Sequence, residues 1–155
     1  MSNAPLESIL QVPSHPSMFS FSELHVVSIL IATVLNMILG FAWYHEKVFG
    51  ALWMQYSGLT KESMKNVNMG ATMATGLLAT FLSVMFLDAL LIATGAGSVR
   101  EAMLVAFLVW MASTVPLGLH GIAWNRHPWG LMILNSTNYL VGFLIASYVL
   151  TVWPF

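Results

Sequence analysis

Four long apolar stretches, separated by short polar segments, dominate the pattern of this chain. They cover residues 24–44, 69–93, 102–124 and 131–153. Each stretch exceeds the roughly 20 residues that an α-helix needs to cross about 30 Å of hydrocarbon. The apolar residues are continuous and do not alternate with polar ones, which argues against the strands of a membrane barrel. The pattern therefore predicts an all-α integral membrane protein with four transmembrane helices.

The polar segment before the first stretch predicts a flexible N-terminal tail. Residues 1–22 include Pro13 and Pro16, which break helices, and they include no lysine or arginine. The segment therefore lacks the basic region of a signal peptide and the arginines of a mitochondrial transit peptide. Residues 23–155 form the predicted four-helix transmembrane domain, which leaves no room for a second folded unit.

Composition supports the membrane prediction and excludes several classes of protein. Five basic and six acidic residues make the charged share 7%, against about 25% in a soluble domain. A net charge of −1 argues against nucleic acid binding, which needs a basic face. Because the chain has no cysteine, it has no disulfide, thiol catalysis or iron–sulfur ligation. No catalytic triad, phosphate loop or metal-ligand spacing is visible, so we predict no metal, no catalytic residues and no cofactor other than bound lipid.

The basic residues predict an orientation in the membrane. Lys47, Lys61 and Lys65 lie in the first loop and Arg126 lies in the last, whereas Arg100 lies alone on the opposite side. Because loops rich in lysine and arginine stay in the cytoplasm, we expect both termini outside. The expected host is a bacterial inner membrane or an organelle inner membrane.

The long first loop predicts a short amphipathic helix. Val48, Leu52, Tyr56 and Leu59 recur there at helical spacing. A helix with this apolar face is expected to lie flat in the membrane interface.

An internal echo suggests two related hairpins. The sequence Gly-Phe-Ala-Trp ends the first stretch at 40–43, and Gly-Ile-Ala-Trp ends the third at 121–124. Two parallel-repeat hairpins, as in some transporters, would explain the echo. Chance would explain it too, because these residues are common at membrane-helix ends and the second and fourth stretches align poorly.

Small residues recur at four-residue steps on two of the predicted helices. Gly76 and Thr80 share a face of the second helix, and Gly142 and Ala146 share a face of the fourth. Small side chains let neighbouring backbones approach closely, so we predict helix packing at both faces.

Asp88 continues the face of Gly76 and Thr80, about one turn from the end of its helix. An ionised carboxylate inside a bilayer costs about 2.5–3.5 kcal/mol, so it needs a partner or water. One interpretation is a proton or cation site. The other is an interfacial aspartate that contacts head-group water or pairs with Arg100.

A denser polar set falls in the predicted cytoplasmic half of the helices. Its members are Asn36, His120, Asn135, Asn138 and Tyr139. At a rise of about 1.5 Å per residue they share one slab of the membrane. One interpretation is a binding pocket or polar path that opens to the cytoplasm, with His120 as its titratable member. The other is packing, because asparagine and histidine hydrogen-bond across membrane helices.

The segment around the first loop resembles a family signature. It reads Gly-Phe-Ala-Trp-Tyr at 40–44 and Val-Phe-Gly-Ala-Leu-Trp-Met at 48–54, and the fourth stretch adds an Asn-x-x-x-Tyr spacing. After the tail, nearly the whole chain resembles the small membrane proteins of domain-of-unknown-function family 1761. The matching positions are Gly40, Trp43, Tyr44, Phe49, Gly50, Trp53, Asn135 and Tyr139.

Three features depart from that family. Its members commonly have a proline shortly after the Trp-Tyr pair, where this chain has His45, Glu46 and Lys47. They often have a histidine after the later tyrosine, where this chain has Leu140. The extended tail is also unusual. The resemblance implies four helices and a long first loop, and it implies no activity because the family has none assigned.

Three functions follow from these observations. We predict a non-enzymatic integral membrane protein that acts as a structural or accessory subunit of a homo-oligomer or a larger membrane complex. Four short helices with faces of small residues and little mass outside the bilayer suit that role. The first alternative is a small oligomeric transporter or channel that uses the polar set. The second is a membrane protein that binds lipid, quinone or pigment.

Overall fold

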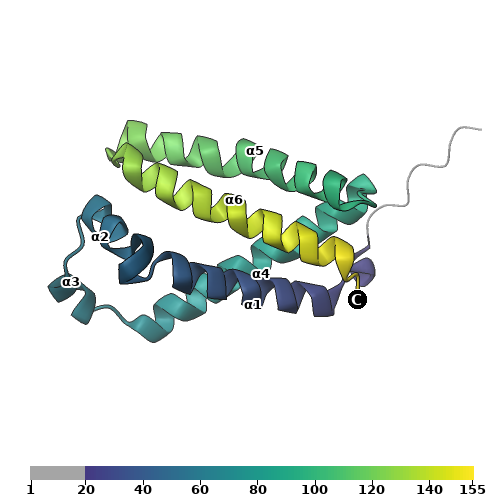
Figure 1. Ribbon diagram of the computed structural model, residues 1–155, viewed down its shortest axis with the longest axis horizontal. Coiled ribbons are helices and arrows are strands. Elements are labelled where there is room, and N and C mark those ends of the chain that lie inside the picture. Colours follow the sequence, from purple (N-terminus) through teal and green to yellow (C-terminus); the bar gives the residue numbers. More distant parts are fainter. Residues whose placement is uncertain (1–19) are drawn as a thin grey trace, which may run out of the picture.

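The described part of the chain is a bundle of long helices. A computed structural model describes residues 20–155 (Figure 1). The long helices are α1 (Val26–Trp43), α4 (Met69–Thr94), α5 (Val99–Asn125) and α6 (Trp129–Val152). All four are long and apolar enough to cross a membrane, and no strand occurs in residues 20–155. The all-α prediction with four transmembrane helices is confirmed, and the chain is a multi-pass integral membrane protein.

Four short helical segments complete the described chain. They are η2 (Phe21–Glu23), η3 (Glu46–Gly50), α2 (Ala51–Ser57) and α3 (Lys61–Lys65). Residues 1–19 of the predicted tail lie outside the described residues, so the flexibility of that tail stays a prediction.

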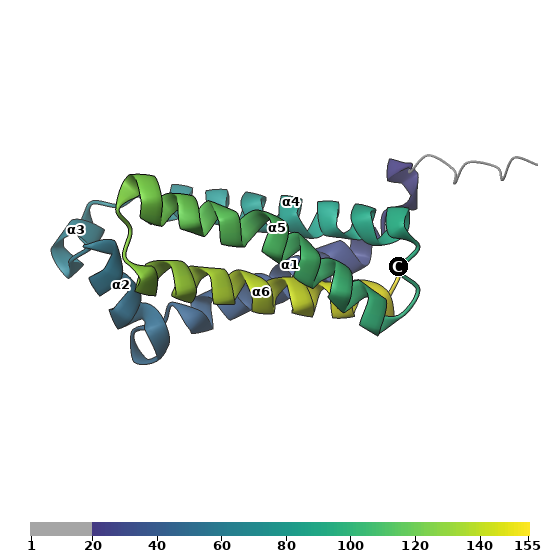
Figure 2. The ribbon, with the colours of Figure 1, turned by 90° about the horizontal axis from the view of Figure 1, so that it is seen from above.

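The bundle has two different ends (Figure 2). We name the end that carries residues 44–68 and 126–128 the loop end, because α2 and α3 lie there. We name the end that carries residues 20–25, 95–98 and 153–155 the terminal end, because α1 begins and α6 stops there.

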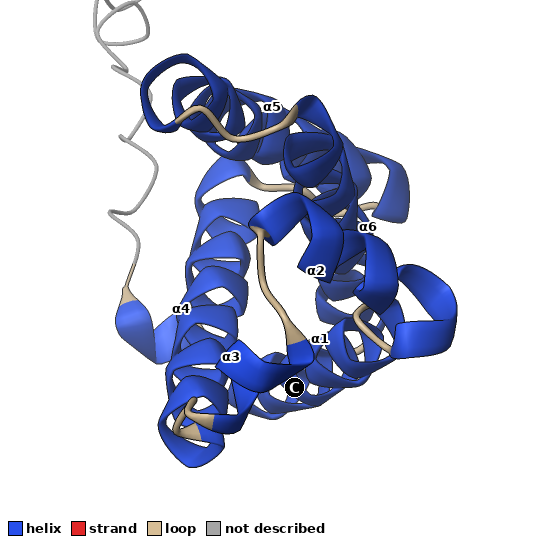
Figure 3. Ribbon diagram, turned by 90° about the vertical axis from the view of Figure 1, so that its left-hand side faces the viewer, coloured by secondary structure: helices blue, strands red, loops and turns tan. Residues whose placement is uncertain are grey.

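Helix α6 holds the bundle together. It packs closely against α5 on one side and α1 on the other, as the view along the bundle shows (Figure 3). Ala32 of α1 and Ala146 of α6 are fully buried in the core, and such small side chains let helix backbones approach closely. The core extends to α4 through Val84, Leu87 and Leu91.

Helix α4 is packed over only half of its length. Its buried residues all lie between Val84 and Leu91, whereas every residue from 69 to 79 is exposed. Gly95 ends α4 with a φ of +66°, and Ser98 starts α5 with a capping box, so a tight turn joins the two helices. From that turn α4 and α5 diverge toward the loop end (Figure 1).

The first loop contains short helices: η3 and α2 include Val48, Leu52 and Tyr56, whereas Leu59 lies beyond the end of α2, so the single amphipathic helix predicted there stays a prediction. Helix α2 contacts α6, where the ring of Tyr56 lies against Gly130. Lys61 donates a hydrogen bond of 2.7 Å to Glu46, and this bond holds the pKa of the Glu46 carboxyl below its usual range. The expected position of this helix in the membrane interface stays a prediction.

The two hairpins of the proposed repeat pack differently. Within the second hairpin, α5 and α6 pack closely, whereas within the first hairpin α1 packs against α4 only where α4 is buried, in its second half. The repeat therefore stays a hypothesis.

Candidate functional site

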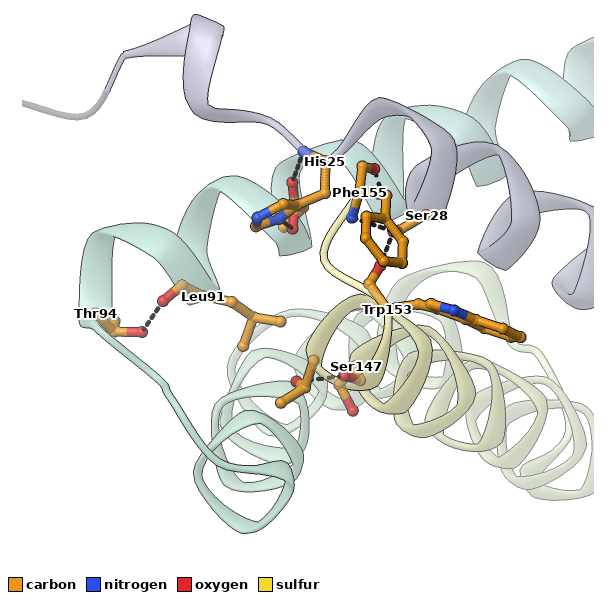
Figure 4. A network of polar contacts seen from close by, with 9 residues as sticks. His25, Ser28, Leu91, Thr94, Ser147, Trp153 and Phe155 are labelled. Atoms are coloured by element: carbon orange, nitrogen blue, oxygen red, sulfur yellow. Dashed lines mark hydrogen bonds and ion pairs between the residues drawn. The ribbon is translucent and has the colours of Figure 1, made fainter.

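Asp88 on α4 is buried at the terminal end, with 1% of its surface exposed. Its Oδ2 accepts a 2.9 Å hydrogen bond from the main-chain N–H of His25. Its Oδ1 lies 2.9 Å from His25 Nδ1, which donates when that nitrogen carries the proton (Figure 4). Arg100, the partner considered from sequence, is exposed and forms no ion pair with Asp88 in the described structure. His25 therefore supplies, through its main chain and its imidazole, both hydrogen-bond partners that the described residues offer to the Asp88 carboxyl.

At the same end of the bundle, residues 153–155 supply hydrogen-bond partners for the first turn of α1. Helices leave their first N–H groups without partners, and here the N–H groups of Val27 and Ser28 donate to the carbonyl of Phe155 at 3.1 and 3.2 Å. The Ser28 hydroxyl donates to the carbonyl of Trp153 and accepts from the Phe155 N–H at 3.1 Å (Figure 4). The Asp88 carboxyl also lies at the positive end of the α1 dipole. These contacts tie α1, α4 and α6 together.

A pocket of about 370 Å³ opens beside His25 and Asp88. The other residues that line it are uncharged, among them Leu91, Thr151 and Pro154. An imidazole against a buried carboxylate can hold a proton between the two groups, so the proton or cation interpretation retains a geometric basis. Among residues 20–155, no cluster of three or more acidic or histidine side chains could hold a metal ion.

The family-signature residues come together at the loop end. The ring centroids of Trp43 and Phe49 lie 4.7 Å apart, and those of Tyr44 and Trp53 lie 5.6 Å apart. The Tyr44 hydroxyl donates a 3.0 Å hydrogen bond to Oδ1 of Asn135 on α6. These aromatic contacts and this hydrogen bond join the end of α1 to η3, α2 and α6, so the signature builds a structural corner.

Gly50 allows the π-helical turn in that corner. Its N–H donates to the His45 carbonyl at 3.0 Å, which closes η3. A Cβ at this position would collide with the main-chain oxygens of Tyr44 and His45. Gly40 differs, because nothing lies within 4 Å of an added Cβ there.

The polar set predicted from sequence is divided between two helix contacts. Asn36 donates to the carbonyl of Ala32 at 2.9 Å, and its Oδ1 lies directly against Gly142 of α6. Asn135 and Tyr139 instead line a pocket between α5 and α6. Asn36 therefore lies at the contact of α1 with α6, whereas Asn135 and Tyr139 lie at the contact of α5 with α6.

The two remaining members of the polar set have different environments. His120 is exposed on the surface of α5. The amide nitrogen of Asn138 is buried and has no hydrogen-bond partner in the described residues.

The two predicted faces of small residues also differ. The face of Gly142 and Ala146 is used inside the chain, where Asn36 occupies the space that a side chain would need. At Gly76, nothing lies within 4 Å of an added Cβ. The Thr80 hydroxyl bonds to the Gly76 carbonyl at 2.9 Å, so it requires no partner from another helix.

Sequence reasoning missed His25 and Ser28. Both lie at the start of the first apolar stretch, and Asp88 lies near the end of the second. Because consecutive membrane helices are antiparallel, those positions share one membrane depth, and this was the available signal. A shared membrane depth does not determine which face of each helix packs against its neighbour.

Comparison with models of protein families gives a match over most of the chain. A sequence model of the family described as "Protein of unknown function (DUF1761)" matches residues 27–151. No curated protein and no solved structure matches the chain.

Proposed function

The chain belongs to the DUF1761 family of proteins of unknown function, and because that family brings no activity with it, we propose a function from the geometry. The protein is a non-enzymatic membrane subunit that assembles with a second copy of itself through the first half of α4. The observation that carries this proposal is Gly76, which lies open on a helix segment whose residues are all exposed from 69 to 79.

Glycine is a costly choice on a helix surface that faces only lipid. It destabilises a helix by about 1 kcal/mol relative to alanine. Gly118, Gly130 and Gly142 each have a neighbouring side chain in the space that a Cβ would take, so the cost is offset by close packing. Gly76 has no such neighbour within the chain, and a helix from a second copy would supply it.

The composition of this segment favours a helix partner over lipid tails. Between Met69 and Ala79 it carries glycine, alanine and threonine on most positions. The hydroxyls of Thr72 and Thr75 donate to carbonyls four residues earlier, at 3.1 and 2.9 Å. The segment therefore has a smooth surface without unsatisfied hydroxyls, which suits close backbone approach.

A second copy is the simplest occupant, because most oligomers are symmetric assemblies of one chain. A two-fold axis beside α4 would place Gly76 against Gly76, and both sides would then have the small surface that the contact needs. The transporter alternative relies on a single shared polar site, and the polar set is divided between two helix contacts with His120 exposed. We therefore prefer assembly over transport.

The absence of cysteine allows a direct test of the proposed contact. In native membranes, Gly76→Cys should give a disulfide-linked dimer on mild oxidation, because the two positions face each other across the axis. Leu104→Cys on α5, which is 57% exposed and lies near the opposite, terminal end of the bundle, is the matched control. Equal yields for both positions would point to random collision and would count against the proposal.

We expect Gly76→Leu to separate the copies without unfolding the chain. The added side chain meets open space within one chain and holds the two α4 helices apart in a dimer. Native mass spectrometry after gentle extraction should then show a monomer in place of the dimer, with an unchanged circular dichroism spectrum. Gly40→Leu, also open in one chain, should leave the dimer intact. If the wild-type complex contained a different protein in place of a second copy, the proposed partner would be wrong. If Gly76→Leu remained a dimer, the proposed contact would be wrong.

A further inference from the structure

A second pocket, of about 290 Å³, lies between α5 and α6 in the half of the bundle nearer the loop end. Leu117, Leu131 and Met132 supply apolar walls, and Asn135 and Ser136 supply polar groups. His127 is the one lining residue with a titratable imidazole, and no lysine, arginine, aspartate or glutamate lines the pocket. The lining therefore favours an uncharged and mainly apolar ligand with a small polar head.

Ser136 is the unusual residue of this pocket. It is 5% exposed, and its hydroxyl oxygen has no hydrogen-bond partner in the described part of the chain. Its neighbour Thr137 donates to the carbonyl of Ile133 at 2.8 Å, and Ser113 on α5 does the same to Val109 at 2.6 Å. A buried hydroxyl without a partner is costly, so an acceptor from a ligand would stabilise it.

Neighbouring contacts hold the polar wall in place. Trp110 of α5 donates its indole N–H to the carbonyl of Ser136 at 2.8 Å. Oδ1 of Asn135 accepts the hydrogen bond from Tyr44, so Oδ1 is used within the protein. The amide nitrogen of Asn135 remains as a donor. Two uncommitted donors, one amide and one hydroxyl, therefore stand one residue apart on α6.

The pocket is accessible from the surface that faces the bilayer. Leu117 and Tyr139, which both line it, are 74% and 55% exposed. A ligand dissolved in the membrane can therefore enter sideways, between α5 and α6.

We propose that this pocket binds a membrane amphiphile whose uncharged carbonyl head accepts hydrogen bonds from Asn135 and Ser136. The apolar part of the ligand lies along Leu117, Leu131 and Met132. Quinones and the esters of neutral glycerolipids share this chemistry. The site is independent of the proposed α4 contact, because the two lie on different helices.

Photo-crosslinking of the full chain in liposomes tests the proposal. A diazirine-bearing ubiquinone analogue and a diazirine-bearing diacylglycerol are used in separate arms, and labelled peptides are identified by mass spectrometry. We expect saturable labelling in the first half of α6 and the second half of α5. The unlabelled competitor that halves this labelling at the lower concentration identifies the ligand class, ubiquinone for a quinone site and diacylglycerol for a neutral-lipid site. Labelling that neither competitor reduces would overturn the proposal.

Single-hydroxyl variants separate binding from ordinary lipid contact. Ser136→Ala should raise the half-effective competitor concentration roughly fivefold, because it removes one hydrogen bond and little volume. Thr137→Ala is the matched control, since that hydroxyl is already bonded within α6 and does not line the pocket. Labelling of the exposed segment 69–79 should be the same in both variants. Equal effects of the two variants on pocket labelling would overturn the proposal.

Discussion

Asp88→Ala should destabilise the folded chain by about 3 kcal/mol, the cost of breaking a buried hydrogen-bonded pair. The variant leaves the His25 N–H and imidazole without their acceptor, in a place where the surrounding residues offer no charged replacement. It also removes the polar contact that joins α4 to the start of α1, beside the apolar core between them. Thermal unfolding in a mild detergent, followed by circular dichroism, should show a midpoint lowered by about 10 °C.

Two further variants show whether burial is the reason. Asp88→Asn keeps an oxygen acceptor in the same position and should lose only about 1 kcal/mol. Glu23→Ala removes an exposed carboxylate at the same end of the bundle and should change the midpoint by less than about 2 °C. If Asp88→Ala and Glu23→Ala gave the same midpoint, the pair of His25 and Asp88 would have no structural role.

Gly142→Leu should be the second severe change, with a loss of about 3 kcal/mol or failure to fold. Oδ1 of Asn36 already occupies the space where a Cβ would stand, and Leu39 lies at its edge. The new side chain would push α1 away from α6, against which it packs through the fully buried Ala32 and Ala146. The unfolding midpoint of purified protein measures the loss.

Gly40→Leu is the matched control for this prediction. It makes the same substitution on α1, at a position where nothing lies within 4 Å of an added Cβ. It should leave the midpoint unchanged or raise it slightly, because leucine is the better helix former. A midpoint for Gly142→Leu as high as that of Gly40→Leu would mean that α1 and α6 do not approach as closely as described.

The contrast between Gly142 and Gly76 separates folding from assembly. Both were predicted from sequence as packing positions at four-residue spacing, and nothing in the sequence distinguishes them. In the structure, Gly142 serves a contact within the chain, while the space beside Gly76 is open. We therefore expect Gly142→Leu to lower stability and Gly76→Leu to change only the mass of the assembly.

Hydrogen bonds join neighbouring helices at both ends of the bundle, but not at the exposed segment of α4. At the terminal end, Asp88 and His25 join α4 to α1, and Ser28 joins α1 to the last residues of the described chain. At the loop end, Tyr44 and Asn135 join α1 to α6. Residues 69–79 take part in neither set of contacts, and the tight turn at Gly95 lets α4 diverge from α5. This geometry leaves a surface of small residues free for a partner.

The family signature illustrates how local sequence and tertiary structure contribute differently. The aromatic residues near the first loop are visible in sequence as amphipathic residues at a membrane-helix end. Asn135 lies about ninety residues later, and only the packing of α1 against α6 brings it to Tyr44. The requirement for Gly50 likewise depends on the π-helical turn, in which the carbonyls of Tyr44 and His45 fill the space of a Cβ.

The sequence by itself determined the number of membrane helices, their limits to within a few residues, and the family. It could do so because hydrocarbon solvates no backbone groups, and each crossing therefore requires a long continuous apolar helix. Only the tertiary structure decided that Asp88 pairs with His25, that the polar set is divided, and that Gly76 is free while Gly142 is packed. Those outcomes depend on how each helix is rotated about its axis. A helix that is apolar on all sides carries almost no periodic signal to set that rotation, so it is fixed by the close packing of particular side chains.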